Sequence, residues 1–431
     1  MTTTLAVRTA PPVRVVAHPG PVLLAGIADG PSLAAHRARC GTMPVADLVQ
    51  VLAAAEAAAV TGRGGAGFPL ARKLRAVAEH AGRRPGRRPA LVVNLAEGEP
   101  ASAKDSALAL LAPHQVLDGA DIVARALRVR EIHVVSPAER PAVGAAVEAA
   151  VTERVEAEDH VGLGNRGRWS GSGGPIRWHL HEAAPGFVSG QARAVLELIA
   201  GRPGLPVTAW APEAISGLDG RPTLLSNAET WAQVAAALRL GPIGYAAHGT
   251  SAEPGTTLLT LPQREEPDGA VVVEAAYGSP WEQVLGDDVN RPVLLGGYHG
   301  TWAAPGALRQ LTVSRVELRR HGLTLGAGVV LPLAADECPV TTTWRITAYL
   351  AAASAGRCGP CRNGLPALAA ELGRLADGDG SVSWTRITAL AGLVDGRGAC
   401  AHPDGTARLV RSMLTTFEDE VAVHLTGGCR A

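Results

Sequence analysis

Short apolar segments alternate with longer helix-like segments along the middle of the chain, and this alternation limits the possible folds more than any other feature. The alternating segments are 90–94, 104–127, 131–135, 142–155, 176–180 and 190–200. The first, third and fifth have the length of strands, and the others have the length and pattern of helices. Strands joined by helical crossovers run parallel, so the sequence predicts an α/β domain with a largely parallel sheet.

The pattern changes twice beyond this region. Short strand-like segments with one brief helix come first, and helix-like segments then continue to the end, at 257–261, 271–275, 280–285, 293–295, 342–353, 365–375, 384–393 and 407–425. Before the first strand, 44–60 is helix-like and a second helix starts at Pro69. A chain of 431 residues is too long for one core. We expect an irregular segment 1–45, an α/β domain 46–245, a small β domain 246–335 and a helical domain 336–431.

The charge balance and the absence of targeting signals limit the possible partners and compartment. Forty basic residues balance forty acidic ones, so no net charge draws the chain to nucleic acid or to anionic lipid. No apolar run is long enough to span a membrane, and the first residues do not form a secretory signal. Six cysteines are too few for a disulfide scaffold. We expect a cytoplasmic protein without a nucleic-acid partner or membrane insertion.

The first helix-like segment ends in a glycine loop with the spacing Gly62-x-Gly64-x-x-Gly67. The usual dinucleotide fingerprint follows a strand, so an ordinary Rossmann turn is not expected here. Closely spaced glycines before a helix can still present backbone N–H groups to a phosphate, and Arg63 and Lys73 add positive charge. The residues alone leave two interpretations open, a structural turn and a phosphate cradle.

An acidic loop containing Asn94, Glu97 and Glu99 follows the first predicted strand. Ligands of open α/β sheets bind at the carboxyl ends of strands, so these groups could bind ribose hydroxyls or the polar edge of a flavin. The alternative is a solvated loop that caps the next helix, with Lys104 and Asp105 as an ordinary surface pair. Without further context, the residues favour this alternative.

Cys358, Cys361 and the distant Cys400 give the strongest chemical signal in the sequence. A Cys-Gly-Pro-Cys pair is the thioredoxin redox motif, although here an Ala-rich helix precedes it instead of a strand. Three thiolates with His402 could bind zinc, and the same spacing suits an iron–sulfur cluster. The remaining cysteines, Cys40, Cys338 and Cys429, have no such neighbours in sequence, so we expect them to be buried or free thiols.

Several collinear stretches resemble the flavoprotein subunit (the F or 51-kDa-type subunit) of NADH–quinone oxidoreductase and related diaphorase subunits. They are GRGGAGFPLARKL (62–74), NLAEGEPASAKD (94–105), PHQVLDG (113–119), GFVSGQARAVLELIAGRPG (186–204), GRPTLLSNAET (220–230), GLTLGAGVVLP (322–332) and RCGPCRNG (357–364) with Cys400. The resemblance implies an FMN-binding α/β domain, a small ubiquitin-like β-grasp (SLBB) domain and a helical bundle that holds a [4Fe–4S] cluster.

The resemblance also implies a role for each matching residue. The FMN phosphate side would meet the glycine loop, which contributes Gly62, Arg63, Gly64, Gly65 and Gly67, together with Lys73. The flavin would meet Asn94, Glu97, Ser226 and Asn227, and NADH would lie near Phe68, Glu99, Phe187 and Gly190. Iron would be held by Cys358, Cys361 and Cys400. No residue is assigned as a catalytic acid or base.

These roles imply an NADH dehydrogenase-type flavoprotein oxidoreductase. Electrons would pass from NADH or NADPH through FMN to the cluster, and then to a protein acceptor or a sister redox subunit. Such a protein would be cytoplasmic or peripheral through a larger complex.

Several positions depart from the family pattern. Ala355 stands where the first cysteine ligand is expected, which implies a [3Fe–4S] cluster, or a fourth ligand such as His402, Asp404 or water. Ala96 replaces an aspartate, and Gln191 and Ala192 replace two glutamates. Lost carboxylates weaken cofactor binding, so two alternatives remain: an FMN electron-transfer protein that has lost NADH binding, and a scaffold with a zinc or empty cysteine site.

Overall fold

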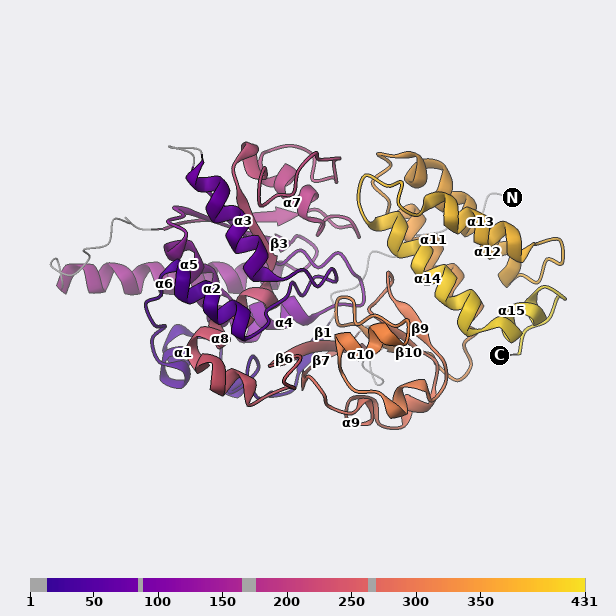
Figure 1. Cartoon of the computed structure of the whole chain (residues 1–431), viewed down its shortest axis with the longest axis horizontal. Coiled ribbons are helices and arrows are strands. Elements are labelled where there is room, and N and C mark those ends of the chain that lie inside the picture. Colours follow the sequence, from indigo (N-terminus) through magenta and orange to yellow (C-terminus); the bar gives the residue numbers. More distant parts are fainter. Residues whose placement is uncertain (1–13, 84–87, 165–175, 263–268, 431) are drawn as a thin grey trace.

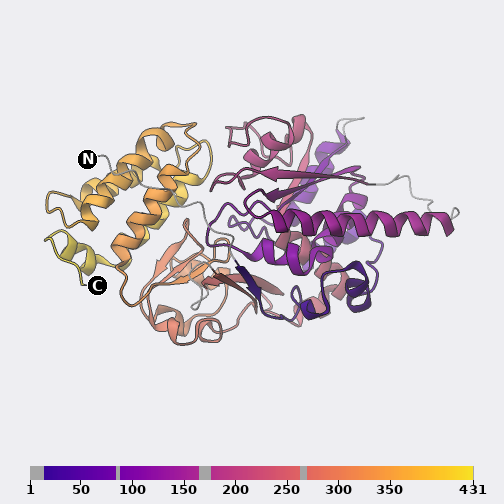
Figure 2. The ribbon, with the colours of Figure 1, turned by 180° about the vertical axis from the view of Figure 1, so that it is seen from behind.

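The structure is a computed structural model that describes residues 14–83, 88–164, 176–262 and 269–430. Figure 1 shows three parts around a common centre. The α/β part lies at one end and the C-terminal helices lie at the other, with the small β part beside both. The view from behind shows the same arrangement (Figure 2). Residues 1–13 of the segment expected to be irregular lie outside the described residues.

A four-stranded parallel sheet forms the α/β part, as the alternating pattern predicts. Its strands are β2 (Ala90–Asn94), β3 (Glu131–Pro137), β4 (Arg177–Ala183) and β5 (Thr223–Asn227), in the order β4-β3-β2-β5. The central strand β2 is buried along its whole length. Side chains alternate across it, so Leu91 and Val93 face one core while Ala90 and Val92 face the other.

Helices cover both faces of this sheet. The helices of the larger core are α2 (Leu48–Ala57), α3 (Leu70–Gly82), α4 (Lys104–Leu111), α5 (Pro113–Ala126), α6 (Pro141–Gly164) and α8 (Ala228–Ala246). Helix α7 (Ala192–Ile199) packs on the opposite face. The single helix expected at 104–127 is two helices, because Pro113 has no backbone N–H and starts a new helix instead of continuing α4.

The strand order reverses at β2, and this reversal positions the site. Strands β3 and β4 extend the sheet on one side of β2, and β5 pairs with its other side. Asn94 and Asn227 are direct partners in the β2–β5 register, so both strands end at the same level. Open α/β sheets bind ligands at such a reversal, beyond the carboxyl ends of the strands.

Two three-stranded sheets form the small β part. The first has the order β1-β7-β6 and the second β10-β8-β9, with strands β1 (Arg14–Ala17), β6 (Thr256–Pro262), β7 (Gly269–Ala276), β8 (Val293–Leu295), β9 (Thr301–Ala303) and β10 (Val330–Pro332). The short helices are α9 (Trp281–Leu285) and α10 (Arg315–Arg320). The ubiquitin-like identity of this part stays a prediction.

The N-terminal segment is less irregular than expected. Strand β1 pairs in parallel with β7, and α1 (Leu33–Cys40) forms a helix capped by Ser32. The carboxylate of Glu274 in β7 accepts hydrogen bonds from the backbone N–H groups of Leu23 and Leu24 at 2.8–3.0 Å. The first sheet therefore draws its strands from both ends of the α/β region.

The C-terminal part is helical, as expected, and has its own core. Its helices are α11 (Pro339–Ala352), α12 (Leu365–Ala376), α13 (Trp384–Val394), α14 (His402–Thr416) and α15 (Glu418–His424). The last segment expected to be one helix breaks at Phe417. Among the described residues, no helix combines the length and apolar character that a membrane span requires.

Candidate functional site

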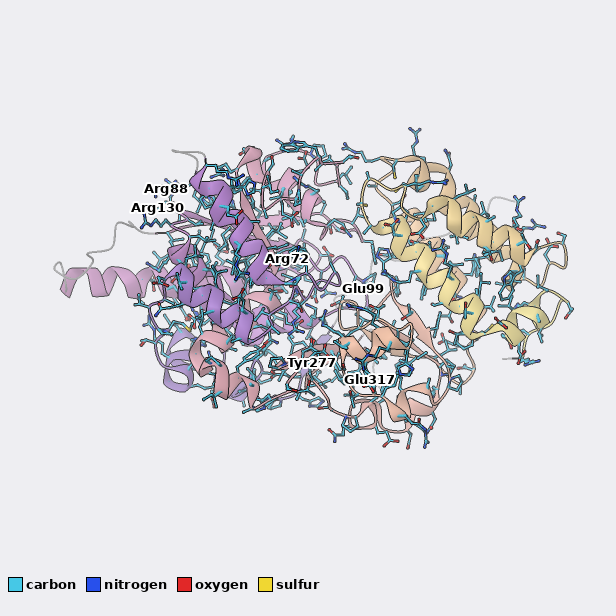
Figure 3. All side chains as sticks on the ribbon, viewed as in Figure 1. Arg72, Arg88, Glu99, Arg130, Tyr277 and Glu317 are labelled. Carbon is cyan, nitrogen blue, oxygen red and sulfur yellow. The ribbon has the colours of Figure 1, made fainter. Side chains whose placement is uncertain are left out.

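A cavity of about 400 Å³ opens where the three parts of the molecule meet. The α/β part contributes the loops after β2 and β5, the β part contributes Gly296, His299 and Gly326, and the helical part contributes Asp404 and Arg408. Figure 3 shows Glu99 at the centre of the molecule, between the α/β part and the helical part. The volume lies within the range of sites for cofactors and small molecules.

Eight of the predicted cofactor residues line this cavity. They are Gly64, Gly65, Asn94, Glu97, Glu99, Phe187, Gly190 and Asn227. The cavity lies beyond the carboxyl ends of β2 and β5, which is the position expected from the strand order. Wall residues from the other two parts, such as His299 and Arg408, were not found from the sequence because they carry no local motif.

The glycine loop follows helix α2 and closes on itself before α3. Its ends are held by a hydrogen bond of 2.8 Å from the Gly62 N–H to the Phe68 carbonyl. Gly65 has φ +107° and Gly67 has φ +62°, backbone conformations that favour glycine. A Cβ atom at Gly64 would meet no atom within 4 Å, so this backbone faces open space in the cavity wall. The loop therefore exposes peptide groups to the cavity, as a cofactor cradle requires.

Several residues predicted for the phosphate side or the NADH side do not line the cavity. Arg63 is buried, where its guanidinium donates to the Thr256 carbonyl at 3.3 Å and also bonds the Tyr277 hydroxyl. Lys73 bonds the Leu225 carbonyl at 3.1 Å and pairs with Glu213 at 2.9 Å. Residues outside the cavity wall also include Gly62, Gly67, Phe68 and Ser226. The Arg63 and Lys73 side chains bond to neighbouring segments of the protein instead of facing the cavity.

The expectation that Lys104 and Asp105 form a surface pair is wrong. Both are buried and line the cavity. The Lys104 ammonium lies 2.8 Å from Asp105 and 3.2 Å from Glu229. Burial alone would lower the pKa of Lys104, but the carboxylates of Asp105, Glu229 and Glu97 raise it above its ordinary value. The cavity wall thus contains an ammonium group that stays protonated and is paired with the carboxylates of Asp105 and Glu229.

Glu97 is held by the protein on both oxygens. One oxygen accepts from Ser102 Oγ at 2.8 Å and from the Asp105 N–H at 3.0 Å. The other accepts from Ser106 Oγ at 2.6 Å and from Arg140 at 2.9 Å. Although burial opposes ionisation, the nearby cations keep the pKa of Glu97 below its ordinary value. This carboxylate therefore fixes the loop after β2 in one position.

Glu99 has a different environment and a different charge. Its Oε2 accepts from the Tyr298 N–H at 2.8 Å, and burial raises its pKa to about 7. No cation contacts it among the contacts of the described residues. Near neutral pH a large share of the Glu99 carboxyl is therefore protonated and can donate a hydrogen bond into the cavity.

We expect the Glu99→Gln variant of the flavin-free protein to be more stable than the wild type at pH 8, but equally stable at pH 5. Folding raises the pKa of this acid from 4.5 to about 7, so the wild type loses stability as pH rises between these values. The shift corresponds to about 1–3 kcal/mol after allowance for partial solvation. Urea-unfolding midpoints at the two pH values measure this difference.

Glu131→Gln is the control with the opposite sign. Despite partial burial, Arg177 and Arg221 hold the pKa of Glu131 below its ordinary value. The stability contributed by this group is present above the unfolded-state pKa and is lost as pH falls. Glu131→Gln should therefore destabilise the protein at pH 8. A Glu99→Gln difference that is the same at both pH values would contradict the prediction.

Two loops meet backbone to backbone at one side of the cavity. The Asn94 side-chain amide donates to the Gly190 carbonyl at 2.9 Å. A Cβ atom added at Gly190 would lie 2.3 Å from the Ala96 carbonyl oxygen. A Cβ atom added at Gly98 would lie 2.2 Å from the Phe187 carbonyl oxygen. These glycines allow an approach that no other residue permits.

Phe187 connects the cavity to the helical part. Its ring centroid lies 4.5 Å from that of His299 and 5.3 Å from that of His402. Phe187 is buried and packs in the core of the helical part, and the same residue lines the cavity. The loop that contains it thus fixes the α/β part against the helices.

The three predicted iron ligands lie together at one end of the helical part. Burial raises the pKa of Cys361 to about 11, and the neighbouring thiols of Cys358 and Cys400 raise it further, which reflects their proximity. A different group of residues, described below, has four potential ligand atoms within 4.8 Å of one another.

The surroundings of these cysteines settle two alternatives from the sequence. His402, proposed as a zinc ligand or fourth iron ligand, contacts the Leu350 carbonyl at 2.8 Å with Nε2 and His299 at 3.2 Å with Nδ1. Both ring nitrogens are therefore engaged away from the thiols. The Cys358–Cys361 pair begins a helical segment in an all-helical part, without the strand that precedes a thioredoxin motif.

The cluster site and the cavity are adjacent. Ala401, the residue after Cys400, lines the cavity, as does Asp404 one turn further along α14. Position 355 is an alanine and carries no ligand atom. Asp404 lies close to Cys400: burial raises the pKa of the Cys400 thiol above its ordinary value, and the charge of Asp404 raises it further. The residues present fit a cluster with three cysteine ligands and a different fourth ligand.

Comparisons with known proteins agree with this geometry. The family described as "Nuo51 FMN-binding domain" matches residues 55–236, and the "NADH-ubiquinone oxidoreductase-F iron-sulfur binding region" matches residues 341–424. Helix α8 and the loops around the cavity fall largely in the first match, and all three clustered cysteines fall in the second. The two matches thus divide the site into a cofactor region and an iron–sulfur region.

Similar proteins have related names and a similar fold. The F subunit of NADH-quinone oxidoreductase from Mycobacterium bovis is 30% identical over 398 residues, covering 90% of this chain and 86% of that protein. The corresponding F subunit of Streptomyces coelicolor is 31% identical over 379 residues, covering 85% of this chain and 81% of that subunit. A chain of an NAD⁺-reducing [NiFe]-hydrogenase, 24% identical, has a TM-score of 0.81 and covers 95% of this chain and 67% of its own. The chain belongs to the family of NADH-quinone oxidoreductase F subunits.

Proposed function

We propose that the chain takes electrons from NADH through FMN in the central cavity and passes them to an iron–sulfur cluster at Cys358, Cys361 and Cys400. The observation that carries this proposal is the adjacency of the two sites: Ala401 lines the cavity and is bonded to Cys400. A bound FMN supplies the chemistry that converts a hydride from NADH into single electrons for iron. The chain supplies position, charge and exclusion of water.

Each part of the cavity wall has a separate task in this proposal. The bare backbone at Gly64 and Gly65 lies against the cofactor and offers peptide groups to its anionic part, and the buried Lys104 ammonium, paired with Asp105 and Glu229, forms a polar part of the same wall. Glu97 and Asn94 hold the loop after β2 in place through hydrogen bonds on each of their oxygens. Protonated Glu99 presents a neutral face, which reduces repulsion of a dinucleotide phosphate.

The cluster would accept electrons from the cavity and pass them onward. Cys358, Cys361 and Cys400 would hold three of its irons, and the helices around them exclude water on the side of the core. Relatives are subunits of larger enzymes by their names, so a sister redox subunit is the expected acceptor for this chain. Such an assembly would also decide whether the protein is associated with a membrane.

One observation favours the alternative in which NADH binding has been lost. Gln191 lines the cavity where the family pattern has a glutamate, and the carboxylate of Glu97 is already occupied by the protein. Fewer free acceptors then remain for the cofactors' hydroxyl groups. A charged acceptor contributes about 1.5–3 kcal/mol, so the loss of two could prevent NADH binding while FMN is retained.

Anaerobic titration with NADH separates these two functions. We expect a small excess of NADH over flavin to bleach the flavin absorbance and then produce the electron paramagnetic resonance (EPR) signal of a reduced cluster. Dithionite, which needs no nucleotide site, is the control for a reducible cluster. Flavin that dithionite bleaches but NADH does not would establish the alternative, and a protein without flavin after reconstitution would overturn both.

A further inference from the structure

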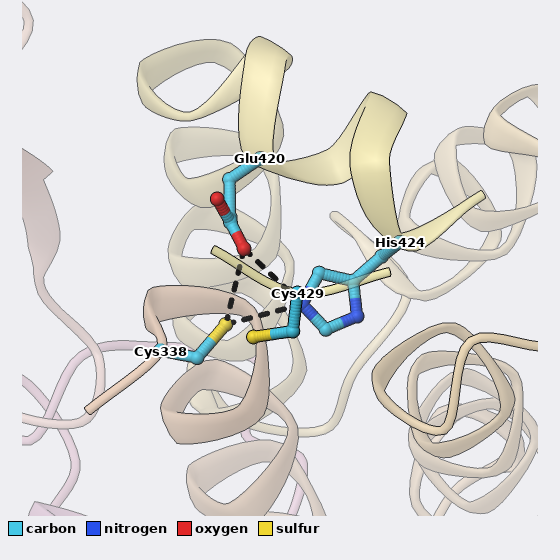
Figure 4. A group of neighbouring side chains, drawn as sticks. All are labelled: Cys338, Glu420, His424 and Cys429. Atoms are coloured by element: carbon cyan, nitrogen blue, oxygen red, sulfur yellow. Dashed lines mark hydrogen bonds and ion pairs between the residues drawn. The ribbon is translucent and has the colours of Figure 1, made fainter. Parts of the chain in front are cut away.

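The helical part contains a second cluster of potential metal ligands that is separate from the three iron-site cysteines. Cys338, Glu420, His424 and Cys429 each offer one ligand atom, and these four atoms lie within 4.8 Å of one another. Figure 4 shows the two sulfurs turned toward each other, with the carboxylate and the imidazole beside them. Cys338 and Cys429 are free thiols, as expected, but they are neighbours in space, which the sequence does not show.

The cluster joins segments that are far apart in the sequence. Cys338 immediately precedes α11, at the entrance to the helical part. Glu420 and His424 are four residues apart on α15, so they share one face of that helix. Cys429 follows the end of α15. A single ion bound here would fix the last helix and the residues after it to the first helix of this part.

Three distances between the ligand atoms are close to those of tetrahedral coordination. Cys338 Sγ lies 3.2 Å from His424 Nε2 and 3.8 Å from Glu420 Oε1, and the last two atoms are 3.4 Å apart. Ligands at ordinary Zn–S, Zn–N and Zn–O bond lengths, placed at tetrahedral angles, are about 3.4 to 3.8 Å apart. Two of the three distances lie in this range and the Sγ–Nε2 distance is slightly shorter, and Cys429 completes the set within 4.8 Å.

The histidine is oriented for metal binding. His424 is buried, and its Nδ1 contacts the Leu375 carbonyl at 3.1 Å. A carbonyl accepts only, so Nδ1 carries the proton and Nε2 presents a lone pair to the cluster. Metal-bound histidines in proteins are fixed in this way by a backbone carbonyl on the opposite nitrogen. The Glu420 carboxylate is also held in place, because its Oε1, the oxygen that faces the cluster, accepts from the Arg430 N–H at 3.0 Å.

We propose that Cys338, Glu420, His424 and Cys429 form a structural zinc site. Two thiolates and an imidazole select Zn²⁺ over the hard cations Mg²⁺ and Ca²⁺. Four protein ligands leave no open position, which is typical of a structural and not a catalytic ion. The ion would stabilise the packing of α15 against α11 and α12. This proposal does not depend on FMN or NADH binding.

Cys429→Ser is the most informative variant, because Cys429 is exposed and its replacement leaves the helical core intact. Cys40→Ser is the matched control, since it removes a thiol from α1 in a distant part of the chain. Both proteins are purified with their iron–sulfur cluster, under reductant, and then dialysed. The readouts are zinc content, the affinity for Zn²⁺ against a chromophoric chelator, and the thiolate-to-metal bands after Co²⁺ exchange.

We expect about one Zn²⁺ per chain in the wild type and in Cys40→Ser, with cobalt bands typical of tetrahedral thiolate coordination. Cys429→Ser should bind Zn²⁺ at least about a hundredfold more weakly, since even the loss of an outer partner costs up to that factor. It should also unfold at a lower temperature, while its iron and flavin contents stay equal to those of the wild type.

Three results would overturn the proposal. The first is a wild type that retains no metal besides iron and binds none on titration. The second is a zinc affinity that Cys429→Ser leaves unchanged, which would place any zinc at the iron-site cysteines. The third is a Cys338–Cys429 disulfide in protein alkylated directly at lysis, because paired sulfurs cannot ligate the ion.

Discussion

Gly190→Ala is expected to abolish stable FMN binding while the chain remains folded. The added Cβ would lie 2.3 Å from the Ala96 carbonyl oxygen, a separation that real Cβ atoms do not adopt. The obstacle is backbone, so the loop after β2 or the loop at 186–190 must move. Such overpacking costs about 1–3 kcal/mol. Because Asn94 and Glu97 lie on the displaced loop, the cavity wall loses its shape.

Flavin content after reconstitution, with the dissociation constant from quenching of FMN fluorescence, measures this effect. We expect the affinity for FMN to fall about tenfold for each 1.4 kcal/mol of strain that reaches the cofactor site. Gly98→Ala should behave alike, because its Cβ would lie 2.2 Å from the Phe187 carbonyl oxygen. Gly82→Ala is the control, since a Cβ at the end of α3 meets nothing within 4 Å. Normal flavin content in both loop variants would show that FMN lies elsewhere.

Local patterns in the sequence predicted the larger part of the fold. The apolar stretches that became β2 and β3 are recognisable because they are short and lie between helical segments, and the mixed segment that became β4 continues the same alternation. Strand β5 has only two leucines between polar residues, and its extended form comes from pairing with β2. Such a strand is determined by a partner far away in the chain, which local periodicity does not contain.

The charged residues of the site were harder to predict for the same reason. Lys104 beside Asp105 looks like a surface pair in sequence, but Glu229 supplies the third charge from α8 and the whole group is buried. Arg63 has the composition of a phosphate contact, yet Tyr277 and Glu229 draw its side chain into the protein. Burial depends on which distant elements pack together, so one sequence cannot decide it.

Ala355→Cys is expected to change the iron–sulfur cluster itself. The chain offers three thiolates, and position 355 stands where the family pattern places the fourth. A cluster with three cysteines releases its fourth iron readily, so we expect wild-type protein handled in air to hold about three irons per chain. The variant should hold about four and keep them in air. Iron and sulfide analysis, with EPR spectra before and after dithionite, measures the change.

Ser354→Cys is the matched control, because it adds a thiol one residue away at a side chain that faces the Cys361 carbonyl. It should leave the iron content unchanged if position 355 is specific.

If instead wild type and Ala355→Cys both hold four stable irons, a residue such as Asp404 must ligate the fourth. Asp404→Asn then decides the matter: its Oδ1 already accepts from the Gly396 N–H at 2.8 Å, so only the other oxygen is free to bind iron. Loss of the fourth iron in that variant would assign the ligand to the helix that also lines the flavin cavity, and electron transfer would then pass along one turn of α14.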